Sequence, residues 1–185
     1  MIDAAPRAVL DTSVLVPTWS RLLLSTLAAA RPILYTPIWC EWIIAEIWRV
    51  LTVRRLRRAP IITAADERQL STSANAMLTA LLQVMTFESV VPPFDPAWPI
   101  ASDANDLPIW SAAVRSGARF VVSHNLHDFP PRDVDGLCAY NGVEFITTAN
   151  FVGEILGLDI DAIAPLSIPA AGHIVHRRHV DVMYR

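Results

Sequence analysis

In the segment Val9-Leu10-Asp11-Thr12-Ser13 an aspartate ends a short apolar run and two hydroxyl residues follow it, which is the strongest indication of the fold in the sequence. In an open parallel sheet, ligands bind at the carboxyl ends of the strands, so an aspartate there is expected to face a crevice. The same residues also form an ordinary helix-capping turn. Three later segments each bring another carboxylate to a similar boundary, and this recurrence favours a functional interpretation.

The composition predicts one domain with a modest appendage. The chain has 185 residues, of which 53% are hydrophobic, enough for a full core. A net charge of −3 argues against a surface that coats nucleic acid everywhere, although it permits a local basic face. Cys40 and Cys138 form neither a CxxC motif nor a disulfide framework, and no signal pattern or membrane-spanning run occurs. We therefore expect a soluble protein of the reducing cytoplasm with no membrane partner.

Apolar runs and helical patterns alternate along the chain. Helices separate five expected strands, which are residues 8–10, 33–35, 87–91, 119–122 and 142–146. This alternation predicts an α/β, three-layer fold in which helices flank a central parallel sheet of four to five strands. The helical stretch 39–85, interrupted near Pro60, is expected to form a lobe beside the active face. Its first helix, 39–51, is apolar nearly all round, which predicts that Trp42 and Trp48 pack in the core or in a dimer interface.

Three local signals predict where helices begin and end. Thr63 and Asp66 have the spacing of a capping box at the start of the helix that runs to about residue 85. Pro108 fits the first turn of a helix, where its missing N–H costs nothing. Gly117 is expected to end that helix.

Glu46 is the second candidate functional acid. It lies in the middle of an apolar helix, where an unpaired carboxylate would be costly to bury, so it requires a partner. Either Arg49 or a metal ion fits that requirement, and the helix alone does not decide between them.

The other acids lie at two further boundaries. Asp103 and Asp106 precede the helix that contains Pro108, where they are either functional or simply capping and helix-dipole residues. Asn125 and Asp128 follow the fourth expected strand, again at its carboxyl end.

Asp11, Glu46, Asp106 and Asp128, together with Asn125, therefore come from four separate segments. Carboxylates gathered in one crevice repel each other unless a cation neutralises them. Oxygen ligands without His or Cys suit a hard divalent ion, Mg²⁺ or Mn²⁺. Such an ion can activate water and stabilise the charge of a phosphodiester during its cleavage.

Four segments in this order resemble the signatures of PIN domains, most closely those of the toxin ribonucleases of VapBC-type toxin–antitoxin pairs. The segments are Val9-Leu10-Asp11-Thr12-Ser13, Glu46-Ile47-Trp48-Arg49-Val50-Leu51, Asp103-x-x-Asp106-x-x-Ile109-x-x-Ala112-Ala113 and Val121-Val122-Ser123-His124-Asn125-Leu126-His127-Asp128-Phe129-Pro130. No single motif is diagnostic, and the strength of the resemblance lies in their order. It covers about residues 7–155 and implies a nuclease domain there, which leaves 156–185 as a C-terminal extension of unknown role.

The resemblance implies a magnesium-dependent endoribonuclease, a hydrolase that cuts single-stranded or looped RNA by attack of water on phosphorus. By the same resemblance Asp11, Glu46 and Asp106 hold the metal, and Asp103 is a supporting acid. Either Asn125 or Asp128 fills the fourth ligand position. The hydroxyl residues Thr12, Ser13 and Ser123 would orient ligands or waters. The resemblance also implies a homodimer and a small antitoxin protein whose tail enters the acidic groove.

A basic cluster and two histidines are candidate RNA contacts. The cluster, Arg54, Arg55, Arg57 and Arg58, either grips phosphates, is recognised by an acidic partner or is a solvated helix end. His124 and His127 either contact RNA and move protons or are simply solvated.

Two other functions compete with the metal-dependent ribonuclease. The first is a catalytically inactive PIN-like module that binds RNA or protein, an alternative kept open by Asn125 standing where many family members have an acid. The second is a phosphatase-like hydrolase with Asp11 as nucleophile. It is disfavoured because Ser13 occupies the position where a second aspartate is generally needed.

Overall fold

The structure is a computed structural model that describes residues 5–56, 62–88, 104–129, 139–140 and 142–159. Its centre is a six-stranded sheet with the order β3-β2-β1-β4-β6-β5. The strands are β1 (Arg7–Leu10), β2 (Thr36–Trp39), β3 (Thr86–Phe87), β4 (Phe120–Val122), β5 (Ala139–Tyr140) and β6 (Val143–Ile146). All neighbouring strands pair in parallel except β5, which pairs antiparallel with β6 at one edge. The predicted α/β fold with a parallel sheet of up to five strands is confirmed, and the short antiparallel edge strand is an addition.

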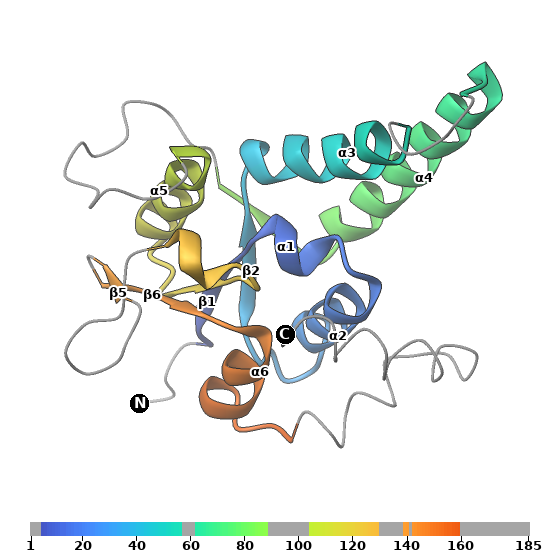
Figure 1. Cartoon of the computed structure of the whole chain (residues 1–185). Coiled ribbons are helices and arrows are strands. Elements are labelled where there is room, and N and C mark those ends of the chain that lie inside the picture. Colours follow the sequence, from blue (N-terminus) through green and yellow to red (C-terminus); the bar gives the residue numbers. More distant parts are fainter. Residues whose placement is uncertain (1–4, 57–61, 89–103, 130–138, 141, 160–185) are drawn as a thin grey trace.

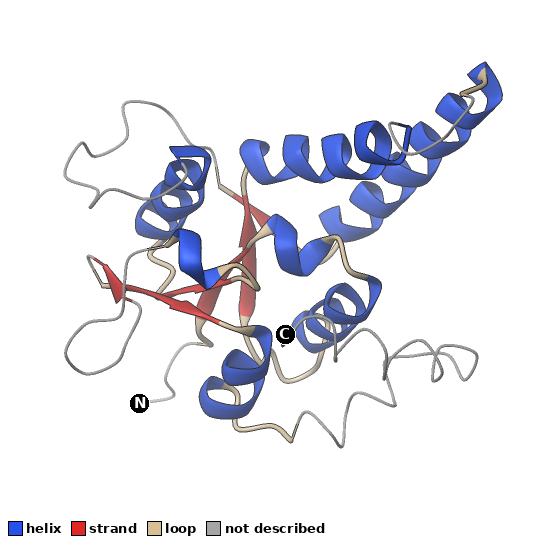
Figure 2. Ribbon diagram, in the orientation of Figure 1, coloured by secondary structure: helices blue, strands red, loops and turns tan. Residues whose placement is uncertain are grey.

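Helices lie on both sides of this sheet (Figure 2). Helices α1 (Thr12–Leu15) and α2 (Thr18–Ala28) connect β1 to β2. Helix α5 (Leu107–Ser116) packs across β1, β2, β4 and β6. Helix α6 (Thr148–Asn150) follows β6 and continues into a π-helical turn, Phe151–Ile155. The central strands are therefore covered on both faces, which explains why β1 and β4 are continuous apolar runs.

Helices α3 (Glu41–Leu56) and α4 (Ala64–Leu82) pack against each other and extend away from the sheet as a hairpin (Figure 1). This hairpin is the lobe expected from the sequence. Trp42 is 44% exposed and Trp48 is 40% exposed, so neither packs in the core of the chain as one of the two alternatives predicted, and a dimer interface stays a prediction for both. A helix in a projecting hairpin has a face that neither its partner nor the sheet covers. Only one side of α3, represented by Ile43 and Ile47, enters the core.

The second strand lies three residues later than expected, at Thr36–Trp39, with Pro37 inside it. The sequence suggested that Pro37 would end the strand, because proline cannot donate a ladder hydrogen bond. β2 lies between β1 and β3. The amide of Thr36 donates to the carbonyl of Pro6, just before β1, so the backbone nitrogen of the next residue, Pro37, points towards the other neighbouring strand. That neighbour, β3, begins only opposite Ile38, and the missing N–H of Pro37 therefore costs no ladder bond.

The predicted helix boundaries agree with the structure. Thr63 and Asp66 form a full capping box at the start of α4, and Pro108 lies in the first turn of α5. Gly117 ends α5 in the left-handed conformation with φ 65°, which glycine adopts without steric cost.

The expected third strand begins at Thr86, and its residues 89–91 lie outside the described part of the chain. None of the described helices is both long enough and apolar enough to cross a bilayer.

Candidate active site

A pocket of about 780 Å³ opens where β1 and β4 end and α3 and α5 begin. It brings together all four carboxylates that the sequence singled out, although they come from four separate segments. Its lining residues are Asp11, Thr12, Ser13, Val16, Pro17, Trp42, Ala45, Glu46, Arg49, Val50, Asn105, Asp106, Asn125 and Asp128. The folded chain thus concentrates acidic groups in one cavity at the carboxyl edge of the sheet, where α/β proteins bind ligands.

Asp11 is the most deeply placed of these acids, with 6% of its surface exposed. It is the N-cap of α1, and its own amide donates to the carbonyl of Val122 in β4 at 3.1 Å. Its Oδ2 atom accepts hydrogen bonds from Ser13 Oγ at 2.5 Å, Ser123 Oγ at 2.8 Å and Ser13 N at 3.3 Å. All of its side-chain bonds to described residues go to Oδ2, so Oδ1 is left for a ligand.

The two hydroxyls that hold Asp11 are themselves held by backbone amides. Ser13 Oγ accepts from the amide of His124 at 2.9 Å, and Ser123 Oγ accepts from the amide of Asn125 at 2.9 Å. The loop after β4 therefore fixes the hydroxyls, and the hydroxyls fix the carboxylate. Thr12, the third hydroxyl residue expected here, has a buried Oγ1 atom with no hydrogen-bond partner among the described residues.

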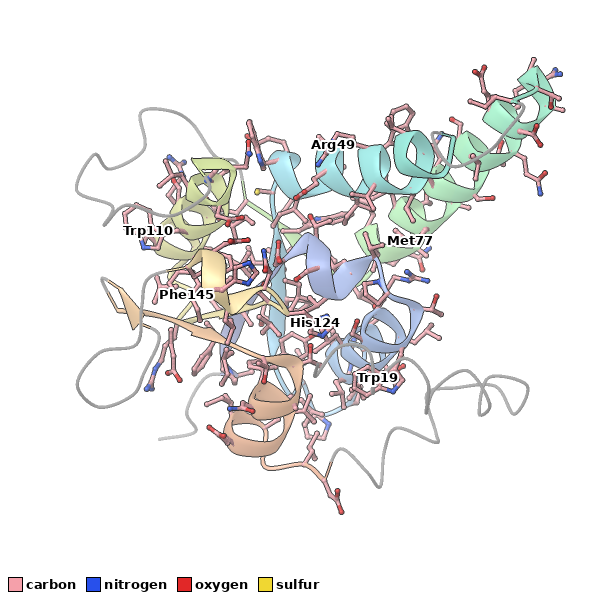
Figure 3. The ribbon with its side chains drawn as sticks, viewed as in Figure 1. Trp19, Arg49, Met77, Trp110, His124 and Phe145 are labelled. Atoms are coloured by element: carbon pink, nitrogen blue, oxygen red, sulfur yellow. The ribbon has the colours of Figure 1, made fainter. Side chains whose placement is uncertain are left out.

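Glu46 lies on α3 with its Oε1 atom 3.2 Å from Arg49 Nη2, and both side chains line the pocket. Arg49, the non-metal partner considered from the sequence and labelled on α3 in Figure 3, is thus a partner of Glu46 in this structure. Glu46 therefore has the partner expected for it, but it is not buried among its apolar neighbours, because its side chain is 32% exposed. The pair therefore resembles a surface helix pair and not a buried ion pair.

Asp106 ends the short 3₁₀ helix η1 (Ala104–Asp106) and occupies the N-cap position of α5. Its side chain makes no capping hydrogen bond there. Asp106 therefore keeps the N-terminal position that suits the helix dipole but makes no capping bond, and its carboxylate lines the pocket.

Asn125 and Asp128 were alternatives for the fourth ligand position, and the structure places them in contact. The Asn125 amide nitrogen donates to Asp128 Oδ2, and His127 Nε2 lies 3.2 Å from Asp128 Oδ1. Both Asn125 and Asp128 line the pocket, at the start and end of the turn that contains η2 (Leu126–Asp128). They consequently present one amide oxygen and one carboxylate as a single unit.

The two histidines lie at the margin of this site. His124, which is labelled in Figure 3, has its Nε2 atom 3.1 Å from Thr148 Oγ1, so its ring lies against α6. Burial lowers the pKa of His124, and contacts with Ser13 and the charge of Asp11 partly oppose that shift. The side chain of His127 is 79% exposed beside Asp128. Neither histidine is among the described residues that line the pocket.

Several other candidates lie beyond what the structure describes. Asp103, Arg57 and Arg58 are outside the described residues. Arg54 and Arg55 belong to the last turns of α3, and their side chains are not described.

Most of the contribution of α3 to the pocket, apart from Glu46 and its possible partner Arg49, was not predicted from the sequence. Trp42, Ala45, Arg49 and Val50 line the pocket with Glu46, at the i, i+3, i+4, i+7 and i+8 positions of one helix face. Counting helical positions from Glu46 would have identified the residues that share its face. A helix that is apolar nearly all round, however, does not show which of its faces is exposed.

The donors in the pocket have the chemistry of a site for a hard divalent cation. Carboxylate, amide and hydroxyl oxygens line it, whereas no thiol or imidazole among the described residues does so. No group of three or more His, Cys, Asp or Glu side chains within the described ranges is arranged to hold an ion between its members. Mg²⁺, however, keeps several waters and takes only one or two carboxylates directly. The unused Oδ1 of Asp11 and the orphaned hydroxyl of Thr12 therefore fit such an ion with its waters.

The PIN domain family model matches residues 7–127. This match covers well over half of the chain, and the chain belongs to the PIN domain family. The matched segment includes Asp11, Glu46 and Asp106 and ends one residue before Asp128. PIN domains are generally nucleases, which places the chain in a family of phosphodiester hydrolases. No curated protein and no solved structure gives a significant match.

Proposed function

We propose that this protein is a Mg²⁺- or Mn²⁺-dependent endoribonuclease that hydrolyses RNA phosphodiester bonds in the pocket described above. The observation that carries this proposal is the convergence of Asp11, Glu46, Asp106 and Asp128 from four segments on one cavity. Four carboxylates sharing a pocket repel each other, and a bound cation offsets that repulsion. Membership of a nuclease family agrees with this chemistry.

Asp11, Glu46, Asp106 and Asp128, with Asn125 beside Asp128, are the residues proposed to hold the ion. A divalent ion bound there supplies an activated water and neutralises charge on the phosphate during attack. The serines Ser13 and Ser123 restrain Oδ2 of Asp11 through two hydrogen bonds, which keeps its carboxylate in one orientation. Arg49 provides a guanidinium at the pocket wall that can bind phosphate oxygens of the RNA.

We further propose that the chain is the toxin of a toxin–antitoxin pair, acting in the cytoplasm as a homodimer and silenced by a small cognate antitoxin. The support is the resemblance of the four ordered motifs to toxin ribonucleases. Induced expression should arrest growth of a bacterial host, and the Asp106→Asn variant expressed to the same level should not. The product of a small adjacent reading frame should rescue growth and co-purify with the chain. Normal growth on expression of the wild type would refute the toxin role.

A second candidate function is a catalytically inactive PIN-like module that binds RNA or protein. Two observations favour it: the Asn125 amide already pairs with Asp128, the other candidate for the fourth ligand position, and Glu46 already has Arg49 as a partner. Calorimetric titration of the full chain with Mg²⁺ and Mn²⁺ at neutral pH separates the two. The nuclease should bind at least one of the ions, whereas absence of binding by both supports the inactive module.

Cleavage itself is tested with a single-stranded RNA labelled at one end. The full chain should cut it in Mg²⁺ or Mn²⁺, stop cutting when EDTA removes the ion and resume when the ion is restored. The Glu67→Gln variant is a matched control, because Glu67 is exposed in the first turn of α4 and is not among the pocket residues. Cleavage that persists in EDTA, or no cleavage with either ion, would reject the metal-dependent mechanism.

A further inference from the structure

The wall of the pocket formed by α3 carries an aromatic side chain that the proposed metal chemistry does not use. Trp42 lies one helical turn before Glu46, about 6 Å away along the helix axis, and both residues line the pocket. Trp42 is 44% exposed as a residue, so its indole is not fully used in packing.

Exposure alone carries no argument, because single exposed apolar side chains are common on protein surfaces. Trp48 shows this on the same helix: it is 40% exposed, lies about 120° away around the axis and does not line the pocket. The distinguishing feature of Trp42 is its place beside a cluster of carboxylates and a guanidinium. Val16, Pro17 and Val50 add apolar surface to the same pocket.

A ligand that fits this arrangement has both a flat apolar face and an anionic group. The indole offers a π-face, and Arg49, two turns along the same helix face, offers a cation for phosphate. Nucleotides in single strands expose both groups, because their bases are not sandwiched in a duplex. Aromatic side chains bind such bases by stacking with little regard to base identity.

We propose that Trp42 stacks on a nucleobase of a single-stranded RNA and thereby holds the adjacent phosphate over the carboxylates. This inference rests on the proposed function, since it concerns how the same pocket positions its substrate. Trp42 is a binding residue in this account and takes no part in the chemical step. It also accounts for a large exposed indole beside the carboxylates of the pocket.

The test measures RNA binding separately from cleavage. Every full-length chain compared carries Asp106→Asn, which removes one carboxylate charge from the pocket. The measurements are made in EDTA, so that cleavage is blocked both by the substitution and by the lack of a divalent ion. Fluorescence anisotropy gives the Kd of a labelled 12-nucleotide single-stranded RNA for the parent and for the added changes Trp42→Ala, Trp42→Phe and Trp48→Ala. A second oligomer of equal length and charge lacks its bases. Light scattering reports whether any variant changes its oligomeric state.

Trp42→Ala should weaken binding of the ordinary RNA by about 5- to 150-fold, the usual effect of losing one stacked base. Trp42→Phe should retain most of the affinity, because phenylalanine keeps a stacking face. Trp48→Ala should bind as tightly as the parent. The oligomer without bases should have the same Kd for the parent and for Trp42→Ala. Light scattering should give the same mass in solution for all variants.

Four results would overturn the inference: a parent that does not bind the RNA, equal loss in Trp42→Ala and Trp48→Ala, a Trp42→Phe variant as weak as Trp42→Ala, or a change of mass in Trp42→Ala. The wild-type cleavage assay is independent of these results. Cleavage by a chain that fails the stacking test removes the inference and keeps the nuclease. A passed stacking test without cleavage removes the nuclease and keeps a single-strand binding site.

Discussion

Ser123 Oγ donates a 2.8 Å hydrogen bond to Oδ2 of Asp11 and so joins the ends of β4 and β1 across 112 positions of sequence. Ser123 is fully buried, and its Oγ also accepts from the amide of Asn125. One hydroxyl therefore orients the carboxylate at the base of the pocket and anchors the turn that carries Asn125 and Asp128. This contact makes the position of Asp11 depend on a residue far from it in the chain.

Replacing Ser123 by alanine should lower the free energy of unfolding by about 1–3 kcal/mol, because a buried amide and a carboxylate both lose a partner. RNA cleavage should fall by about 10- to 100-fold, as expected when a residue that orients a metal ligand is removed. Urea unfolding and initial cleavage rates measure the two effects. Ser73→Ala on the exposed face of α4 is the control and should change stability by less than about 0.5 kcal/mol. A stable and fully active Ser123→Ala variant would show that the contact has no role.

Asp11→Asn and Asp106→Asn should each reduce RNA cleavage by more than about 100-fold while the far-UV circular dichroism stays that of the wild type. Each change keeps the size of the side chain and removes one charge from the proposed ion site. Calorimetry should show weaker Mg²⁺ binding by both variants. Cleavage at the wild-type rate by either variant would exclude that residue from the site.

The sheet could be predicted from the sequence because its central strands are short, continuous apolar runs that end at polar residues. β1 and β4 were found for this reason, and the capping residues Thr63 and Gly117 marked helix ends by local chemistry alone. β2 was misplaced because the effect of Pro37 depends on which neighbouring strand faces its nitrogen. Strand pairing decides that point, and no local pattern records it.

Three acids of the pocket, Asp11, Asp106 and Asp128, were predictable for a similar reason, since strand ends and helix starts converge at one edge of a parallel sheet. The wall formed by α3 was not. Trp42 and Arg49 are exposed because the α3–α4 hairpin leaves the sheet, which a helix with apolar residues on every side does not reveal. The contact of Asn125 with Asp128 was not predicted either. The sequence offered the two residues as alternatives for the fourth ligand position, whereas in the structure they are hydrogen-bonded neighbours.

The capping box of α4 predicts a pH dependence. Hydrogen bonds from Thr63 lower the pKa of Asp66, so this interaction stabilises the fold above the ordinary aspartate pKa and is lost as pH falls through the lowered value. Thr63→Ala should raise the pKa of Asp66 in a carbon-detected NMR titration. Its thermal midpoint should be below that of the wild type near neutral pH, and the difference should narrow in acid. Thr72→Ala, exposed on the same helix, should leave the Asp66 titration unchanged.

The pairing of Glu46 with Arg49 makes a prediction that separates metal binding from stability. Arg49→Gln removes an exposed helix pair, so the free energy of unfolding should change by less than about 0.5 kcal/mol. The affinity for Mg²⁺ should nevertheless rise, because the ion no longer competes with a guanidinium for the Glu46 carboxylate. RNA affinity should fall, and the slope of log Kd against log salt should drop by about 0.7 as one phosphate contact is lost. Arg68→Gln, on the exposed side of α4, should change neither titration. Unchanged Mg²⁺ affinity in Arg49→Gln would show that Glu46 does not contribute to the ion site.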